Sequence, residues 1–112
     1  MVERRRYRRL PVRLAVSCKR SDSPRGQLYS AHTVNVSPGG LLVEISGDVF
    51  EVGNLLCVEL FIPPTRGLLE QGGRMSGLAR VVRVEGVLAA GGLFSGKYGV
   101  AVEFCRAPRL SI

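Results

Sequence analysis

The sequence predicts a single all-β domain of six short strands, an antiparallel barrel or sandwich, and three observations lead to that fold class. Apolar and polar residues alternate with a period of two through several short segments, as half-buried strands require. The chain has fourteen glycines, and most of them lie at the joints between those segments. No window repeats apolar residues at the three- and four-residue spacing of a helix. A chain of 112 residues has room for one core, and a barrel or sandwich avoids the exposed edges and the exposed apolar face that a single small sheet would leave.

The first three strands are expected in the N-terminal half of the chain. Every second residue from Val12 to Cys18 is apolar, so a strand is predicted over residues 12–19. The segment 21–26, which is rich in Ser, Pro and Gly, is typical of a turn. A second strand follows over residues 28–36, and a third over residues 41–45.

The remaining strands are expected in the C-terminal half. Residues 55–62 form a nearly continuous apolar run that ends at two prolines, which cannot donate hydrogen bonds to a β-ladder. Residues 75–84 and 98–104 give the fifth and sixth strands. The apolar, glycine-broken segment 88–96 between them is expected to be a long hairpin loop packed over a barrel end.

Positive charge is concentrated at the N-terminus. The net charge is +7, and residues 1–25 carry nine Arg or Lys against two acids, whereas the rest of the chain carries seven of each sign. Such a local concentration of positive charge attracts anions. Residues 1–11 are therefore interpreted as an arginine-rich arm in front of a barrel domain, residues 12–112. Composition alone leaves open whether the arm is simply solvated or binds an anion.

The cysteines and acids exclude several classes of protein. Cys18, Cys57 and Cys105 are widely spaced and form no C-x-x-C pair, so we expect reduced, buried thiols in a cytoplasmic protein and no zinc site. No apolar segment approaches the length of a membrane span. One histidine and scattered acids assemble no triad, carboxylate pair or metal cluster. A binding protein without cofactor or metal is expected, not an enzyme.

Two segments carry side chains suited to a guanine nucleotide. Arg5 and Arg9 present planar forks of donors that pair with phosphate oxygens or with guanine O6 and N7. Asn35 offers a carbonyl to guanine N–H groups, Ser37 offers a hydroxyl, and Gly40 offers a backbone that a ligand can approach closely. The second segment is also typical of a plain turn, in which Asn and Ser bond their own backbone.

Taken together, the two segments resemble the PilZ domain family. The R-x-x-x-R pattern of Arg5 to Arg9 and the N-x-S-x-x-G pattern of Asn35 to Gly40 are similar to that family's two motifs. Residues 79–84 and 98–104 are similar to its fifth and closing strands, so the resemblance covers nearly the whole chain. It implies one domain over residues 1–112, a six-stranded antiparallel β-barrel of the split-barrel type that binds the bacterial second messenger cyclic di-GMP.

The resemblance also implies a ligand-binding role for particular residues. Arg5 and Arg9 correspond to residues that hold guanine edges and phosphates, while Asn35, Ser37 and Gly40 correspond to residues that cradle the other guanine side on the barrel surface. The family accepts Asn or Asp at the first position of the second motif. An uncharged amide there gives up a charge-assisted hydrogen bond, worth about 1 kcal/mol.

The resemblance also implies ligand-binding roles for two further arginines. Arg4 stands directly before the arginine pair, where the family's residue is linked to ligand stoichiometry, and an arginine there implies an intercalated ligand dimer. Arg83 lies on the fifth strand, where a guanidinium can stack on a guanine. The alternative for Arg83 is a solvated arginine on a strand face.

The expected function is that of a cyclic di-GMP receptor in bacterial signalling. Ligand phosphates screen the repulsion among the arm's five arginines and fold the arm over the barrel, which changes the surface seen by an unidentified effector protein or linked domain. Two other interpretations stay open. A small barrel with an arginine-rich arm can hold single-stranded nucleic acid, although few exposed aromatic side chains are expected here. The chain can also be a PilZ-like adaptor that binds protein without the ligand.

Overall fold

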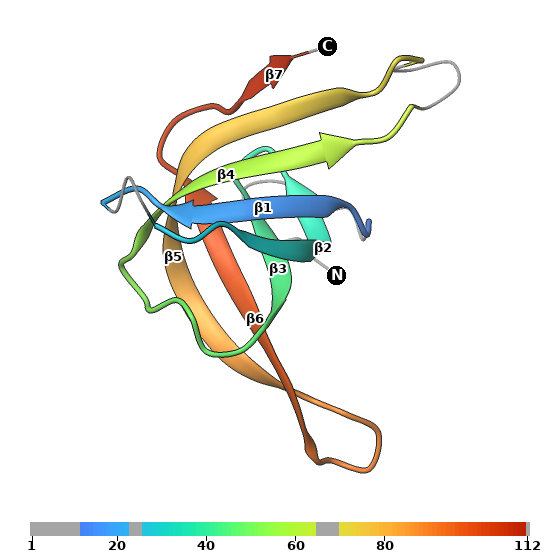
Figure 1. Cartoon of the computed structure of the whole chain (residues 1–112), viewed down its shortest axis with the longest axis vertical. Helices are drawn as coiled ribbons and strands as arrows, with labels where there is room; N and C mark the ends of the chain where they lie inside the picture. The colour runs from blue at the N-terminus through green and yellow to red at the C-terminus, as the bar shows by residue number, and fades with distance from the viewer. Residues whose placement is uncertain (1–11, 23–25, 65–69, 112) are drawn as a thin grey trace, which may run out of the picture.

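The structure, a computed structural model, describes residues 12–22, 26–64 and 70–111. In that part of the chain it contains strands and no helix, and all strands belong to one antiparallel sheet (Figure 1). The all-β prediction is confirmed. The strands are β1 (Ala15–Arg20), β2 (Tyr29–Ser37), β3 (Gly40–Ser46), β4 (Leu55–Ile62), β5 (Gly73–Leu88), β6 (Phe94–Phe104) and β7 (Arg109–Ser111).

Strands β1 to β6 close into a barrel, as predicted. The strand order is β4-β1-β2-β3-β6-β5-β7, and β4 also pairs with β5. That last pairing runs from Leu55 opposite Arg80 to Ile62 opposite Gly73, so neither strand is left as an open edge there. In Figure 1, β1 and β4 run across the view while β6 descends steeply behind them, as expected for strands on opposite walls of a small barrel.

The core is built from every second residue of each strand. Inward side chains are mostly Val, Leu and Ala, whose burial stabilises the fold by about 1.5–3 kcal/mol for each of the larger ones. Phe50, from the loop between β3 and β4, is also buried, and its ring meets that of Tyr29 edge to face at 5.3 Å. The buried cluster consists of Val16, Cys18, Ala31, Leu41, Val43, Ile45, Phe50, Leu56, Val58, Leu60, Ala79, Val81, Val100 and Val102.

The segment between β5 and β6 corrects one expectation. Pairing between these strands continues as far as Leu88 opposite Phe94, so the long loop predicted over residues 88–96 is wrong. The turn occupies residues 89–93, where Gly91 and Gly92 have φ of +86° and +81° and let the chain reverse quickly. Figure 1 shows this hairpin projecting away from the barrel instead of covering its end.

A seventh strand was not expected. β7 pairs with the first part of β5, where Arg109, Leu110 and Ser111 lie opposite Ser76, Met75 and Arg74. Three residues after a proline give no alternation long enough to be recognised in the sequence. β7 adds to the β5 edge next to the barrel and does not alter its closure.

The cysteines correct a second expectation, because only one of them is buried. Cys18 points into the core, whereas Cys57 and Cys105 are exposed, and none forms a disulfide. Cys57 lies between the inward residues Leu56 and Val58 of β4, so the pleat of the strand turns it outward. Burial raises the pKa of the Cys18 thiol from 9.0 to about 12.

Candidate functional site

The predicted site divides between described and undescribed residues. Arg4, Arg5 and Arg9 lie outside the described part of the chain. Asn35, Ser37, Gly40 and Arg83 are described, and they lie on β2, β3 and β5.

Ser37 and Gly40 close a tight hairpin between β2 and β3. The chain reverses over Pro38 and Gly39, and Ser37 pairs directly with Gly40. The Ser37 hydroxyl accepts a hydrogen bond from the Gly40 N–H at 3.2 Å and lies 3.4 Å from the Gly40 carbonyl oxygen, to which it donates. The hydroxyl therefore bonds the backbone of its own turn, which is the plain structural role of this motif.

Gly40 lies against the neighbouring strand β6. A Cβ atom built on Gly40 would be 2.1 Å from the Val102 carbonyl oxygen and 3.2 Å from the Glu103 Cα. Real Cβ atoms do not approach a backbone so closely, so any side chain here would force β3 and β6 apart. Packing between these strands is sufficient to explain the glycine.

Asn35 and Arg83 are joined by one row of paired residues across four strands. Asn35 pairs with Leu42, Leu42 with Ala101, and Ala101 with Arg83. Directly paired residues of an antiparallel sheet point to the same face, and the residues that flank Leu42 on β3 are in the core. The row therefore lies on the outer face. Three strand spacings separate its ends by about 14 Å along the sheet.

A bulge at each end of the row turns its polar residue outward. In β2, Val34 is inserted between Thr33, which pairs with the core residue Val43, and Asn35. Without the insertion, the period of two would put Asn35 on the same inner face as Thr33. In β5, Val82 is inserted in the same way between the core residue Val81 and Arg83. Val34 and Val82 are themselves 42% and 41% exposed.

The adjoining row brings a second arginine to the same face. Ser37 pairs with Gly40, Gly40 with Glu103, and Glu103 with Arg80, which is exposed. Residues three apart on a regular strand face opposite ways, but the Val82 bulge puts Arg80 and Arg83 on one face. Sequence reasoning missed Arg80 for that reason. We call the two rows the Asn35–Arg83 face; its members are Asn35, Leu42, Ala101, Arg83, Ser37, Gly40, Glu103 and Arg80.

Arg83 has one charged neighbour on its own strand. Its Nε lies 3.3 Å from Oε1 of Glu85, and both side chains are largely exposed. An exposed pair of this kind is worth about 0–1 kcal/mol, because water screens it and two flexible side chains must be held in place. The guanidinium therefore keeps its freedom to turn towards a ligand on the row.

The described chain begins beside the same face. The Thr33 N–H donates to the Leu14 carbonyl at 2.9 Å, and the Leu14 N–H donates to the Thr33 hydroxyl at 2.8 Å. That hydroxyl donates in turn to the Val12 carbonyl at 2.6 Å. Residues 12–14 thus run alongside the Asn35 end of β2. Arg9 precedes Val12 by three residues, a span of at most about 10 Å.

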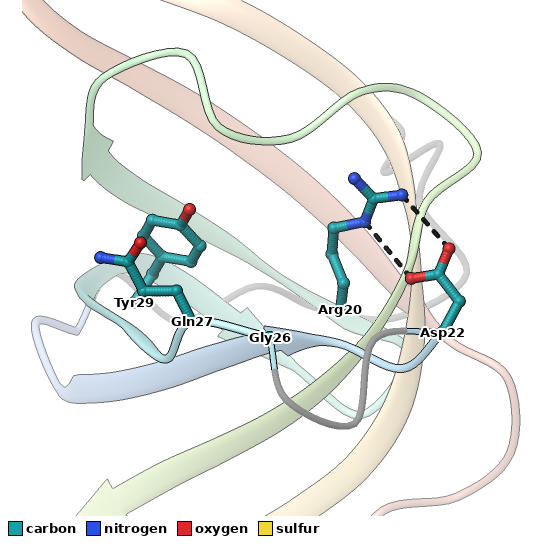
Figure 2. Close-up of a pocket in the computed structure, with 5 residues that line it drawn as sticks. All are labelled: Arg20, Asp22, Gly26, Gln27 and Tyr29. Carbon is teal, nitrogen blue, oxygen red and sulfur yellow. Dashed lines mark hydrogen bonds and ion pairs between the residues drawn. The ribbon is translucent and has the colours of Figure 1, made fainter.

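A surface hollow elsewhere on the barrel does not belong to this face. It has a volume of about 410 Å³ and is lined by Arg20, Asp22, Gly26, Gln27 and Tyr29 (Figure 2). Arg20 is held by Asp22 through two hydrogen bonds of 3.2 and 3.3 Å. Tyr29 precedes Asn35 by six residues along β2, a distance of about 20 Å.

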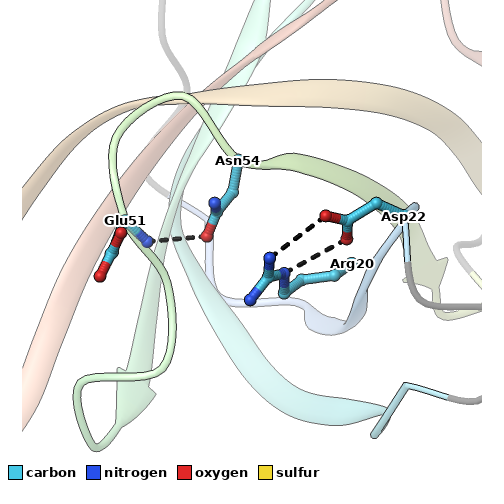
Figure 3. Close-up of polar contacts among 4 residues, drawn as sticks. All are labelled: Arg20, Asp22, Glu51 and Asn54. Atoms are coloured by element: carbon cyan, nitrogen blue, oxygen red, sulfur yellow. Dashed lines mark hydrogen bonds and ion pairs between the residues drawn. The ribbon is translucent and has the colours of Figure 1, made fainter.

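The turn after β1 is fixed by its own contacts. The Ser21 N–H donates to the Leu55 carbonyl at 2.9 Å, which ties this turn to the start of β4. Figure 3 shows the Arg20–Asp22 pair together with the loop contact from the Glu51 N–H to Asn54 Oδ1, at 2.9 Å. These contacts explain local order and engage none of the predicted site residues.

Two kinds of feature are absent from the described residues. No group of three or more His, Cys, Asp or Glu side chains in residues 12–22, 26–64 and 70–111 is placed to hold a metal ion. Nor does that part of the chain contain a helix of the length and hydrophobicity needed to cross a lipid bilayer.

Comparison with known proteins gives a family match and a fold match. The family model of the PilZ domain matches residues 3–109. No curated protein matches the chain.

Two solved structures share the fold. One is the Bacillus subtilis inhibitor of motility, MotI/DgrA, with a TM-score of 0.71, 20% identity, and coverage of 95% of this chain and 44% of that one. The other is the PilZ domain of YcgR from Escherichia coli, solved with cyclic di-GMP, with a TM-score of 0.67, 14% identity, and coverage of 93% and 79%. This chain therefore spans less than half the length of the first.

Proposed function

The chain belongs to the PilZ domain family, and from that membership we propose that it is a receptor domain for cyclic di-GMP. One observation carries the proposal. Two β-bulges, at Val34 in β2 and at Val82 in β5, turn Asn35 and Arg83 onto one outer row of the barrel. Bulges cost ladder hydrogen bonds and commonly re-aim side chains at functional sites. Both bulges act on the same row, so the barrel presents Asn35 and Arg83 together on one side.

The chemistry of the row suits a guanine base. The Asn35 carbonyl accepts hydrogen bonds from guanine N–H groups, and the Arg83 guanidinium stacks on the ring or pairs with phosphate. Between them, the half-buried Leu42 offers apolar surface to a flat purine, whereas Ala101 is covered and only 7% exposed. Ser37 contributes a hydroxyl that can exchange its bond within the turn for one to the ligand.

The arm completes the proposed site. Arg5 and Arg9 would reach phosphates and guanine edges from residues 1–11, which join the barrel at Val12 beside the Asn35 end of β2. Arg4 would support an intercalated ligand dimer, so the proposed stoichiometry is two cyclic di-GMP molecules per chain. Ligand phosphates would neutralise the arm and draw it over the Asn35–Arg83 face. The changed surface would then act on an effector protein or linked domain.

The proposed setting is the bacterial cytoplasm. Cys57 and Cys105 are exposed and unbonded, which fits a reducing compartment. The proposed role needs no cofactor and no catalysis, because binding and release of the second messenger suffice for a switch.

A second candidate function, a protein adaptor that does not bind the ligand, is favoured by the β5–β6 hairpin. Leu88, Leu93 and Phe94 lie at or near its tip and are more than half exposed. Apolar side chains gathered on a projecting hairpin are typical of a surface that docks on another protein. Nucleic-acid binding has less support, because the exposed aromatic residues Phe61 and Phe94 lie outside the Asn35–Arg83 face.

Isothermal titration calorimetry with cyclic di-GMP tests the proposal. Wild-type protein should bind two molecules per chain, and Arg9→Ala should bind at least tenfold more weakly, since it loses a charge-assisted contact. Arg109→Ala removes the same charge from exposed strand β7, which pairs with residues 74–76 of β5 and not with the part that carries Arg80 and Arg83, and should bind like the wild type. A single-stranded oligonucleotide serves as the competing ligand.

Two results would overturn the proposal. The first is no heat with cyclic di-GMP together with oligonucleotide binding that weakens steeply with salt, which identifies a nucleic-acid binder. The second is no heat with either ligand by folded protein, which leaves the adaptor.

A further inference from the structure

Thr33 is a polar side chain in an otherwise apolar core. It is 1% exposed, and no other polar or charged residue of the described chain is buried. Valine has nearly the same shape and would fill this inward position without a hydroxyl to satisfy. A buried hydroxyl is costly unless it is hydrogen-bonded, so its partners indicate its role.

Both partners of the hydroxyl belong to the segment that leads out of the N-terminal arm. Oγ1 accepts from the Leu14 N–H at 2.8 Å and donates to the Val12 carbonyl at 2.6 Å. The Thr33 N–H adds a backbone bond to the Leu14 carbonyl at 2.9 Å. One residue thus fixes both ends of the 12–14 segment, and it does so immediately before the bulge at Val34.

We infer that the Thr33 hydroxyl is a positioning group that holds the root of the arginine-rich arm beside Asn35. The inference rests on the proposed function and names a residue that touches no ligand. With Val12 held, Arg9, three residues before it, stays within about 10 Å of this anchor, so the arm meets the ligand from a fixed point beside Asn35. Without the hydroxyl, the backbone bond to Leu14 remains but residue 12 is released.

The expected effect is a loss of affinity out of proportion to any loss of stability. Thr33→Val keeps the shape of the core and removes both hydroxyl bonds, so the dissociation constant for cyclic di-GMP should rise about three- to tenfold. Val12 is exposed, so water can replace the lost partner of its carbonyl, and the fold should persist.

The experiment compares four proteins by calorimetry with cyclic di-GMP and by amide hydrogen exchange. Thr33→Ser keeps the hydroxyl and should retain the wild-type affinity. Val58→Ala removes a buried side chain from β4 and serves as the control for general destabilisation. It should lower the melting temperature and leave the affinity unchanged. In Thr33→Val, exchange of the Leu14 amide should accelerate, because that N–H has lost its acceptor.

The outcomes separate this inference from the function on which it rests. If the wild type binds cyclic di-GMP and Thr33→Val binds it with the same affinity, the inference is overturned and the receptor proposal stays intact. Equal losses of affinity in Thr33→Val, Thr33→Ser and Val58→Ala also overturn it, since the effect would then follow stability. Absence of binding by the wild type overturns the receptor function and the affinity effect together. Unchanged Leu14 exchange in Thr33→Val would show that the hydroxyl does not hold the root.

Discussion

Asn35 and Arg83 each follow an exposed valine that is inserted into its strand. The insertions at Val34 and Val82 reverse the face of the sheet to which the next residue points. The positions of the Asn35 and Arg83 side chains therefore depend on these bulges and not on residue type alone. Gly40 shows the opposite case. In the sequence, Gly40 was interpreted as a position where a ligand can approach the backbone. In the structure, the close approach of β6 already requires a residue without a side chain there.

Gly40→Ala should destabilise the barrel by about 1–3 kcal/mol, because the new Cβ would meet the Val102 carbonyl at 2.1 Å and push β3 from β6. Urea unfolding measures the change. Gly99→Ala is the matched control on the same β3–β6 seam, since its nearest atom, Leu42 Cδ1, lies at an ordinary 3.7 Å. Equal midpoints for the two variants would contradict the packing account of Gly40.

Arg83→Ala should weaken cyclic di-GMP binding by about 1 kcal/mol, roughly fivefold, through loss of stacking on guanine. Its unfolding free energy should change little, because the Arg83–Glu85 pair is exposed. Calorimetry and thermal unfolding check the two parts separately. Were Arg109→Ala to weaken binding equally, overall charge and not the position of Arg83 would govern affinity.

Cys18 should make stability fall in alkaline solution. Burial raises the pKa of its thiol from 9.0 to about 12, so the folded state keeps the proton that the unfolded state loses. This contribution is complete below about pH 9 and declines as the pH rises towards 12, by up to about 1.4 kcal/mol per pH unit. Urea unfolding at pH 8 and pH 10 measures it, and Cys18→Ala should show a smaller difference. An equal difference in both proteins would exclude Cys18 as the source.

At the scale of elements, the sequence predicted what the local apolar pattern and the turn residues control. The strand over residues 55–62 is observed with the same bounds, and five others were placed with ends shifted by a few residues. The β5–β6 hairpin was wrongly predicted as a long loop, because closely spaced glycines are typical of loops. In the structure, the positive φ values of Gly91, Gly92 and Gly96 belong instead to a short turn and an irregular strand. Tertiary pairing, which no local pattern encodes, extends those strands beyond the barrel.

The projecting hairpin should contribute little to folding. Leu93 is 74% exposed at its tip, so Leu93→Ser should change the unfolding free energy by less than about 0.5 kcal/mol. Phe50→Ala, in the barrel core, should cost about 3–5 kcal/mol. Thermal unfolding of both variants tests the contrast. A large loss in Leu93→Ser would mean that the hairpin packs more tightly than its exposure indicates.

At the scale of the whole molecule, the barrel separates two tasks. Inward residues of β1 to β6 form a closed apolar core, and the outer surface is free to carry charge and a ligand. The family and the barrel could be predicted because the sequence itself shows two short motifs and six short apolar or alternating segments. The complete Asn35–Arg83 face could not be predicted, because Arg80 reaches it only through the bulge at Val82. The role of Thr33 could not be predicted either, because it depends on hydrogen bonds to residues some twenty positions away.

The most direct test of the receptor account is a map of amide chemical shifts during titration with cyclic di-GMP. The largest changes should fall on Asn35, Ser37, Gly40 and Arg83, with smaller ones at Leu14 and Thr33. Residues around the Arg20–Asp22 hollow should stay unchanged. Changes confined to that hollow or to the β5–β6 hairpin, with the Asn35–Arg83 face unaffected at saturating ligand, would contradict the account.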